Sequence, residues 1–535
     1  MTSPPPNTSL PSATLTEGHI TAAVEAYRGG RTWGGGEISL WRPSNLSADA
    51  AVLRDAAKVR ARARDLVRNN PHARNAVRMN RDAVSGSGLK LSLKIDWRTL
   101  GLRSIEEAAA WQDEVTREWE AYAEGYDYSA DARRQATFSQ LFQLVDQTEY
   151  TDGEALAVVE MKAGVLPYRT CLNIIDVDRL QNPVGHVDSD RLRGGVERDK
   201  NGAPIAYHIR DGHPLDAGVG ITTLQSKRIV RRTPWGRPVV FHIYDQSRPE
   251  MTRGVSEFAS VIVSMRMLGD YHEAELNTAI TRAAYAAVIK TELDWSQAMA
   301  VIGARGGTAQ TSGNPIFDQV SSYLHGAGQY HAATDVTWQG SKIPHLLPNE
   351  SLEVIKSDSG NSNFPEFEKA FIRHLAAGLG VEAHELAKNY ADVNYSAARA
   401  ALLSVWRTYR ARRMRLISQL AMPFFGAWLE EAVQIGTVKL PSGVDDFLAA
   451  KRYLVRGTFI AWGKPMIDPM KERQAQMLGI QMGADTLEDI CAEEGDNWRD
   501  KVDQIAFERR YRESMGLTPD IQAAQVADAA DEVGS

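Results

Sequence analysis

The sequence predicts a helix-rich α+β protein. Apolar residues recur at helical spacing near both ends of the chain, alternating apolar and polar residues occupy much of 154–244, and one helical pattern, 256–290, is longer than a typical globular helix. Of the 535 residues, 43% are hydrophobic and 24% are charged, which is typical of globular proteins with ample core. We expect about two to four structural regions.

The N-terminal part is predicted to be helical after a mobile segment, 1–46. Ser47 is a candidate helix cap, Pro71 breaks the helical pattern that follows, and Gly86 and Gly88 end it. A half-buried strand is then predicted over 89–95, because leucine and isoleucine alternate there with polar residues. The helices predicted in this part cover 47–84, 105–122 and 138–150.

The middle of the chain is predicted to be mostly β. Its expected strands are 155–161, 172–177, 205–209 and 239–244. A helix of 35 residues is expected next, over 256–290, interrupted only by Gly269. A Gly/Ser-rich stretch, 303–328, and strand-like alternation over 336–354 follow it.

A short helix, a polar loop and an arginine-rich helix come next. Glu366 and Glu368 suit the positive start of a helix over 365–379, and Gly378 and Gly380 end it. Residues 387–395 are predicted to be a loop, which can present polar groups to a partner such as DNA. A long helix is expected from 396, with a kink at Pro423 and an end at Gly436. A compact helical region is predicted from 468 to about 515.

The long helix carries six arginines and no acidic residue over 396–416. These side chains could neutralise phosphates, pair with acidic residues of the same or a neighbouring chain, or be solvated. Arg399, Arg410 and Arg413 share roughly one face, and the others spread around the helix, so no single DNA-facing stripe is predicted. Ion pairs within or between subunits are therefore favoured over phosphate contacts for Arg399, Arg407, Arg410, Arg412, Arg413 and Arg415.

Bulk properties exclude several classes of protein. A formal charge of −7 and a pI near 6.0 exclude a generally basic protein that coats DNA. Cys171 and Cys491 are too few for a disulfide framework or a cysteine-based metal site. No apolar run approaches the ~20 residues of a membrane span, and the N-terminus lacks the features of a signal peptide. We expect a protein that is made in the cytosol and has no membrane partner.

Catalytic motifs have structural explanations in this sequence. There is no G-x-x-x-x-G-K-[ST] loop for an NTPase, and neither His272-Glu273 nor His384-Glu385 is followed by the second histidine of a zinc protease. The Asp176-Val-Asp178 pair could hold a divalent cation, but aspartates of this kind are common in turns at strand ends. We therefore expect no catalytic residue, no metal, no cofactor and no enzyme activity.

A series of short motifs runs along the chain from about residue 50 to 515. They are Gly86-Ser-Gly-Leu89, Asp152-Gly-Glu154, Ile175-Asp-Val-Asp-Arg-Leu180, Gly195-Val-Glu-Arg-Asp-Lys-Asn-Gly202 with Pro204 and Ala206-Tyr-His208, Phe241-His-Ile-Tyr244 with Arg248-Pro249 and Arg253-Gly-Val255, Leu375-Ala-Ala-Gly-Leu-Gly-Val381, Asn394-Tyr-Ser-Ala-Ala-Arg399 and Ile467-Asp-Pro-Met-Lys-Glu472. In this order the motifs resemble the lambda-type family of tailed-phage portal proteins. Glu250 replaces a glycine that is common in this family, and 296–336 matches nothing in it.

The resemblance implies a portal fold with wing, stem, clip and crown, in a ring of usually twelve subunits around a DNA channel. It places the parts as follows: a mobile N-terminal segment 1–46, wing 47–255, first stem helix 256–290, clip 291–362, second stem helix 363–381, tunnel loop 382–395, long wing helix 396–440 and a C-terminal helical crown 441–535.

The resemblance also implies a function: a head–tail connector at one capsid vertex through which double-stranded DNA is packaged and ejected. The implied partners are other copies of the chain, DNA without sequence specificity, the terminase large subunit, a major capsid or scaffolding protein, and head-completion proteins. The protein would belong to the virion and assemble in the bacterial cytoplasm. Alternatives are a capsid or tail component without a channel and a nucleic-acid-processing enzyme. The residues expected to meet DNA are Lys388, Asn389, Tyr390, Asn394 and Tyr395, and the six arginines become subunit-interface candidates.

Overall fold

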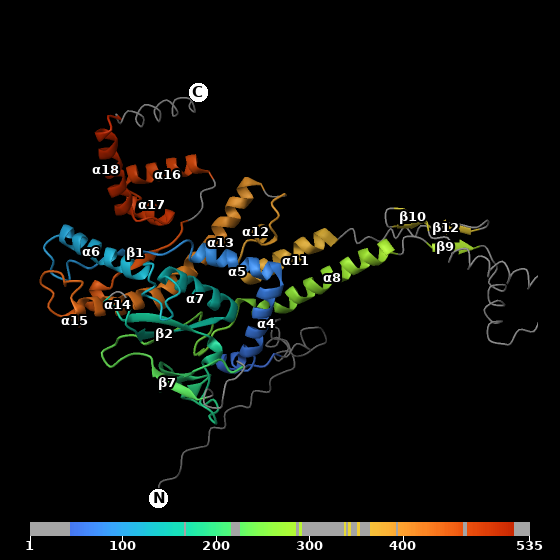
Figure 1. Cartoon of the computed structure of the whole chain (residues 1–535), viewed down its shortest axis with the longest axis horizontal. Helices are drawn as coiled ribbons and strands as arrows, with labels where there is room; N and C mark the ends of the chain where they lie inside the picture. The colour runs from blue at the N-terminus through green and yellow to red at the C-terminus, as the bar shows by residue number, and fades with distance from the viewer. Residues whose placement is uncertain are drawn as a thin grey trace, which may run out of the picture. The chain divides into compact units, whose positions relative to one another are not determined.

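The structure is a computed structural model that describes residues 43–164, 167–215, 225–284, 288–291, 336–338, 341–343, 350–353, 364–391, 394–463 and 468–517 (Figure 1). The chain divides into two compact units: 1–57, 178–231 and 244–254 form the first, and the remaining residues form the second. The predictions for 1–42, for 303–328 and for the residues after 517 lie outside the described residues.

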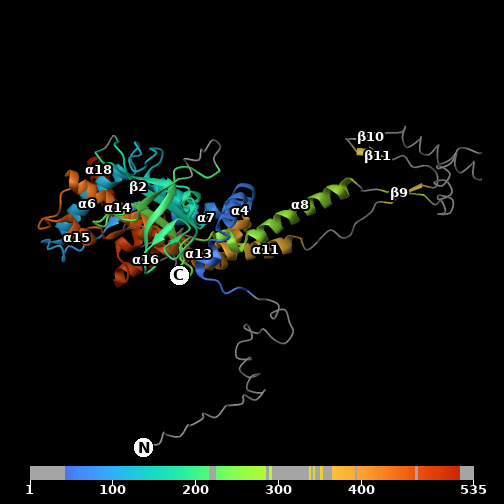
Figure 2. The same ribbon diagram turned by 90° about the horizontal axis from the view of Figure 1, so that it is seen from below.

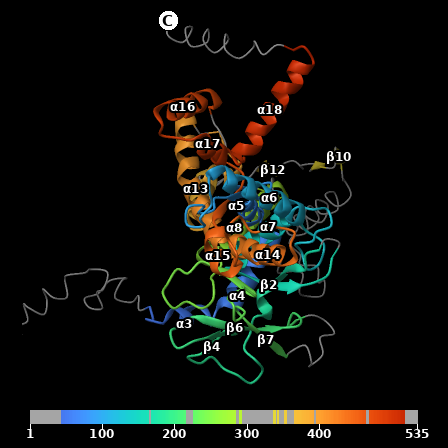
Figure 3. The same ribbon diagram turned by 90° about the vertical axis from the view of Figure 1, so that its left-hand side faces the viewer.

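The first unit is built on a four-stranded antiparallel sheet, seen in Figure 3. Its strand order is β4 (Leu192–Arg193), β5 (Val196–Arg198), β6 (Pro204–Arg210) and β7 (Ser226–Val230). Ser47 caps a short helix, α3 (Ala48–Val52), as predicted.

Asp49 of α3 joins the strands of the first unit to its last segment. The buried Asp49 carboxylate accepts hydrogen bonds from the Thr252 amide at 2.7 Å and from Arg193 Nη1 at 3.0 Å. A charged group this deep is tolerated because several donors surround it.

The main core of the second unit is aromatic. Trp119 lies at its centre, with ring centroids 5.2 Å from Phe138, 5.3 Å from Phe425 and 5.2 Å from Trp428. Burial of such side chains is the largest stabilising contribution of a core like this. The core is formed by α6 (Ile105–Ala123), α7 (Phe138–Asp152), α14 (Met422–Ile435), α15 (Phe447–Leu454) and a sheet of order β3 (Thr170–Ile175), β2 (Glu154–Met161), β8 (Val240–Tyr244).

Residues 441–463 belong to this core, so their prediction as part of a C-terminal helical region is wrong. Strand β13 (Gly457–Ile460) pairs antiparallel with β1 (Lys90–Leu93), and Phe459 is buried. At Gly457 a Cβ atom would lie 2.3 Å from the carbonyl oxygen of Ser92, so only glycine allows this approach. The pairing was missed because the partner strands are far apart in sequence, although β1 itself was predicted.

A second, smaller core surrounds the start of helix α8. Figures 1 and 2 show α8 (Ile262–Ala284) running beside α11 (Phe364–Leu379), and the rings of Tyr271 and Phe364 lie 5.3 Å apart. The other elements of this core are α4 (Ala56–Asn69), α5 (Pro71–Val84), the 3₁₀ turn η4 (Glu257–Ser260) and α12 (Ala383–Ala387).

The predicted 35-residue helix over 256–290 is too long at both ends. Ser256 caps η4, α8 has 23 residues, and Val288–Thr291 is instead strand β9, paired with β12 (Glu350–Glu353). The strand-like pattern predicted over 336–354 contains β12 and a hairpin of β10 (Val336–Trp338) and β11 (Ser341–Ile343).

The predicted long helix from 396 consists of three pieces. Helix α13 (Tyr395–Leu416) continues through a π-helical turn, η6 (Ile417–Ala421), into α14, and Gly436 ends α14 with φ +82° as predicted. Pro423 lies in the first turn of α14, immediately after the π turn. The predicted helices after 468 are α16 (Pro469–Met482), α17 (Leu487–Glu494) and α18 (Trp498–Ser514). None of the described helices has the length and hydropathy of a membrane span.

Candidate functional site

The candidate site is the segment from α11 to α13, which contains the predicted DNA-contacting loop. Ile372, Leu375 and Leu379 of α11 are buried in the smaller core, and Gly380 ends the helix with φ +66°. At Gly378 a Cβ atom would lie 2.4 Å from Val261, so this glycine allows α11 to approach η4 closely. The N-terminal side of the loop is therefore fixed by packing.

Helix α12 lies inside the region that was predicted to be the tunnel loop, 382–395. The Glu382 side chain caps α12 by accepting a hydrogen bond from the Glu385 amide at 2.7 Å, and Leu386 is buried. Asn75 of α5 donates to the Glu385 and Leu386 carbonyl oxygens at 2.9 and 3.1 Å. Five residues are too few for a periodic signal, so the sequence did not reveal α12. Asn75 supplies the second anchor of the loop.

The loop proper is 388–394, because Ala387 ends α12 and Tyr395 begins α13. Lys388 has a left-handed backbone with φ +53°, and the Asn389 amide donates to the His384 carbonyl at 3.0 Å. The Asn389 side-chain oxygen then accepts a hydrogen bond from the Ala391 amide at 3.1 Å. These bonds turn the chain away from α12.

Three side chains of this loop are available to a partner. Lys388, Asn389 and Tyr390 are exposed, and Tyr390 retains 57% of its accessible surface. Asn394 is exposed as well, but its side-chain oxygen caps α13 by accepting from the Ala397 amide at 2.8 Å. Asn394 thus has a structural role in starting α13, because its side-chain oxygen is engaged in the cap. The side chain of Tyr395 lies outside the described residues.

Acidic groups surround the base of the loop. The pKa of Tyr390 is raised by partial burial and then by the charges of Glu385 and Glu382, so its hydroxyl remains a neutral donor at physiological pH. The Lys388 ammonium lies 3.7 Å from the Glu385 carboxylate, which offsets much of its positive charge. The loop can donate hydrogen bonds to phosphate oxygens without a strong cationic attraction.

Three of the six arginines bind groups of their own chain. Arg412 donates to Asn80 at 2.7 Å, pairs with Glu257 and lies 4.7 Å above the Tyr150 ring centre. Arg415 binds Glu149 at 2.7 Å.

Arg413 donates to the carbonyl oxygens of Ala83, Val84 and Trp462. Its pKa is lowered to about 10, chiefly by burial and secondarily by Arg410. Arg412, Arg413 and Arg415 therefore fasten α13 to α5, α7 and η4.

The other three arginines form one stripe on α13, in which Arg407 and Arg410 are exposed and Arg399 is half-buried. Arg399, Arg407 and Arg410 make no hydrogen bond or ion pair with any residue that the structure describes, and at 3.6 residues per turn they fall within about 80° of the helix circumference. Leu403 and Met414 are exposed on the same side. Arg413, which the spacing placed on one face with Arg399 and Arg410, instead binds carbonyl groups of its own chain.

A groove of about 410 Å³ borders the loop. Its lining includes Glu366, Lys369 and Arg373 of α11, His384 of α12 and Asn389 of the loop. Charges of both signs line it, which favours a polar protein surface over a small apolar ligand.

The two aspartates considered for a cation have protein partners. Asp176, in the second unit, accepts from Arg64 Nη2 at 3.0 Å. Asp178, in the first unit, has a carboxylate oxygen 3.4 Å from His213 Nε2.

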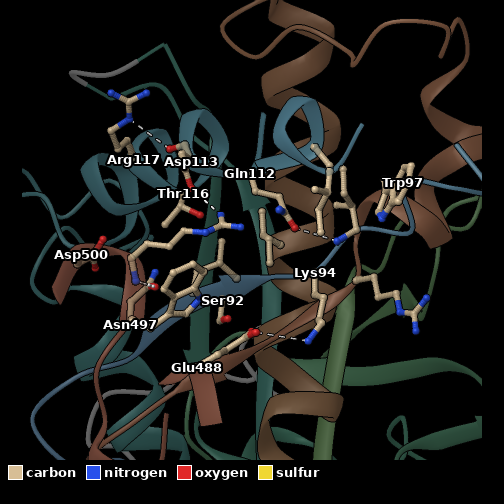
Figure 4. A pocket seen from close by; sticks show the side chains of 18 of the residues that line it. Ser92, Lys94, Trp97, Gln112, Asp113, Thr116, Arg117, Glu488, Asn497 and Asp500 are labelled. Carbon is tan, nitrogen blue, oxygen red and sulfur yellow. Dashed lines mark hydrogen bonds and ion pairs between the residues drawn. The ribbon is translucent and has the colours of Figure 1, made fainter. Parts of the chain in front are cut away.

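A larger pocket of about 680 Å³ lies between β1, α6 and the C-terminal helices (Figure 4). Figure 4 shows Lys94 and Glu488 facing one another, with 3.5 Å between ammonium and carboxylate, and Asp113 binds Arg499 at 2.8 Å. Gln112 accepts the Ile95 amide at 3.0 Å. The side chains here pair with one another, and they attach α17 and α18 to the body of the unit.

Known proteins similar to this chain were found by structure and by sequence. The neck of a native gene transfer agent particle, computed with C12 symmetry, matches 81% of this chain and 90% of its own with 14% identity and a TM-score of 0.42. The portal protein of Escherichia phage N15 is 33% identical over 94% of this chain and 93% of its own. Portal protein B of Escherichia phage lambda is 33% identical over 93% and 92%.

The family model of phage portal proteins of the lambda family matches residues 34–413. This match covers well over half of the chain and includes the smaller core, the loop and most of α13. With two relatives at 33% identity over nearly their whole length, the resemblance noted from the short motifs is confirmed. The chain belongs to the lambda family of phage portal proteins.

Proposed function

We propose that the loop 388–394 meets DNA inside the channel of a portal ring built from copies of this chain. The chain's role as a portal follows from its family: it is a virion protein that forms the channel at one capsid vertex through which double-stranded DNA is packaged and ejected. The observation that carries the proposal is an exposed polar loop held at both ends, by Asn75 against α12 and by the Asn394 cap of α13. Such anchoring keeps the loop in one place while DNA moves past it.

The charge of the loop fits a channel that must not hold DNA tightly. Many arginine or lysine contacts to phosphate would give strong, salt-dependent binding. Lys388 is the one basic residue in 382–395 besides His384, and Glu382, Glu385 and Asp392 are acidic. Hydrogen bonds from Asn389 and Tyr390 to the DNA backbone are independent of base sequence, as translocation requires.

The arginine stripe of α13 (Arg399, Arg407 and Arg410) contacts a neighbouring copy in this proposal. Its cations alternate with exposed Leu403 and Met414, and a mixed apolar and cationic surface is typical of protein interfaces. Arg412, Arg413 and Arg415 keep their partners in the same chain and hold α13 against neighbouring helices of that chain. The set of subunit-interface candidates is therefore reduced from six arginines to three.

The remaining parts are assigned by the same proposal. Residues 47–255 and 396–463 form the wing, α8 and α11 the stem, 291–362 the clip and 468–535 the crown, in a ring of twelve copies assembled in the bacterial cytoplasm. The terminase large subunit docks on the clip and supplies ATP hydrolysis, so the portal itself is not an enzyme. A major capsid or scaffolding protein and the head-completion proteins are its other partners.

Deleting 389–393 tests the role of the loop. We expect rings of normal size by negative-stain imaging, but particles that package or retain less DNA, because the channel has lost its contact with DNA. The substitution Tyr390→Ala should have a milder effect in the same direction, and Tyr126→Ala, which alters a tyrosine that is 92% exposed elsewhere, is the matched control. Full-length packaging and retention by the deletion variant would contradict the proposal.

A further inference from the structure

Helix α18 has the local signals of a complete helix but no buried side chain. Asn497 caps its start by accepting the Arg499 amide at 3.1 Å, and Gly516, with φ +71°, ends it while the Leu517 amide donates to the Arg512 carbonyl at 2.9 Å. All residues from 502 to 517 are exposed, and α18 buries none of its 17 residues. Because most of the stability of helices in proteins comes from packing of an apolar face, another surface should cover this one.

The exposed face of α18 is apolar along one line. Phe507, Tyr511 and Met515, spaced four residues apart, form a stripe that we call the α18 stripe. The Phe507 and Tyr511 rings stack with centroids 6.3 Å apart, and each side chain retains more than half of its accessible surface. Arg510 and Arg512 lie on the two sides of the stripe. Contiguous apolar surface with a charged rim marks an interaction site.

The segment 468–496, which contains α16 and α17, has the complementary properties. Helix α16 also buries none of its residues, and its exposed apolar side chains are Met470, Met477, Leu478, Ile480 and Met482. Thioether groups of methionine make favourable contacts with aromatic rings. The segment holds eight acidic and two basic residues, and among the described residues its exposed Asp485, Asp489 and Glu493 make no ion pair.

No segment that the structure describes covers the α18 stripe. The first turn of α18 is held to its own unit by Arg499, bound to Asp113 at 2.8 Å, and by Lys501, 3.3 Å from Asp496. Beyond that turn α18 is exposed and so is most of α16, so the chain's own α16 does not bury the stripe. In a closed ring each copy presents one surface to the next and a different surface to the previous one.

We infer that the α18 stripe of each copy docks on the 468–496 segment of the adjacent copy. Phe507 and Tyr511 contact the methionines of α16, and Arg510 and Arg512 face the carboxylates around α17. The contact rests on the proposed function, because only a ring supplies an adjacent copy to every subunit. The C-terminal helices thereby form an intersubunit contact of their own. It is separate from the loop that meets DNA and from the arginine stripe of α13.

Chemical crosslinking of the full chain tests this contact. In the first experiment, rings assembled from the double variant Phe507→Cys with Met477→Cys are treated with a short bismaleimide. In the second, the two single variants are mixed before assembly, with one of them isotopically heavy, and the rings are treated in the same way. We expect a ladder of covalent oligomers from the double variant and light–heavy crosslinked peptides from the mixture. Phe507→Cys with Met267→Cys is the matched control, because Met267 is also an exposed methionine on a helix, and it should give no ladder. The native cysteines are buried.

The outcomes separate this inference from the portal function. Rings that crosslink only within one chain, or that react equally in the control pair, overturn the inference and leave the portal function standing. Failure of the wild-type chain to form any ring overturns both.

Substitutions in the α18 stripe give a second test. We expect Phe507→Ser with Tyr511→Ser to unfold at the wild-type midpoint as a monomer, because α18 contributes no buried side chain, and to give at least a tenfold lower yield of rings. Rings at wild-type yield would overturn the inference.

Discussion

Helices α14 and α18 both have regular ends, but they differ in how much of their surface the described part of the chain buries. Nine of the 14 residues of α14 are buried, from Phe424 to Ala432, and they include two glutamates with protein partners. Helix α18 buries none of its 17. The difference teaches that burial within one chain separates the parts of a portal subunit that fold alone from the parts that depend on assembly. We propose that the arginine stripe of α13 and the α18 stripe belong to the second kind.

The largest expected effect is at Trp428 of α14. This side chain is fully buried against Trp119, so Trp428→Ala should lower the free energy of unfolding of the monomer by about 3–5 kcal/mol. Phe507→Ala in α18 should change it by less than about 0.5 kcal/mol, as exposed positions do. Urea unfolding of both variants measures the contrast, and similar losses in the two would refute it.

The next largest expected effect is a difference in the free energy of unfolding between two arginine variants of α13. Arg412→Ala removes the ion pair with Glu257 and the hydrogen bond to buried Asn80, and breaking a buried pair of this kind costs about 3 kcal/mol. Arg407→Ala, on the exposed stripe of the same helix, should leave the unfolding of the monomer unchanged and reduce ring yield. If Arg407→Ala destabilises the monomer as much as Arg412→Ala does, the division of the arginines is wrong.

The pH dependence of stability should report on Asp146, which lies under Arg412. Burial raises the pKa of Asp146 to about 7, although Asn80 and Ser85 donate to its carboxylate. A carboxyl group with a raised pKa in the folded state favours folding when protonated, so its contribution is fully present below pH ~4 and is lost as the pH rises through 7. We expect Asp146→Asn to flatten the fall in the melting temperature of the monomer between pH 5 and pH 8. An unchanged slope would contradict this role of Asp146.

The smallest expected effect is at the base of the loop. Asn75→Ala removes the side-chain hydrogen bonds to the end of α12, which should cost about 1 kcal/mol and loosen 388–394. Faster tryptic cleavage after Lys388, with α14 still protected, is the expected observation. Asn69→Ala, which alters an exposed asparagine bonded to Asp65 within α4, is the control.

Much of the fold could be predicted because its signals are local. The cap at Ser47, the break at Pro71 and the end at Gly436 are set by residues within one turn, and the structure has each of them. The pairing of β1 with β13 could not be predicted, because it depends on chain segments more than 360 residues apart. The predicted 35-residue helix failed because Val288 and Ile289 fit a helical pattern and a strand equally well.

The sequence predicted the position of the loop but not the partners of the arginines that follow it. Exposed Lys388, Asn389 and Tyr390 lie where the polar pattern predicted a loop. Their contact with DNA remains a prediction. The division of the arginines could not be derived from spacing, because whether Arg413 turns inward depends on the free carbonyl groups at the end of α5.

Amide hydrogen exchange of the full chain, as monomer and as assembled ring, tests the central claim most directly. The account predicts that the amides of 502–514 exchange rapidly in the monomer and at least tenfold more slowly in the ring, while those of α14 exchange slowly and equally in both. Equal exchange of 502–514 in the monomer and in the ring would contradict the claim that an adjacent subunit covers α18 in the ring.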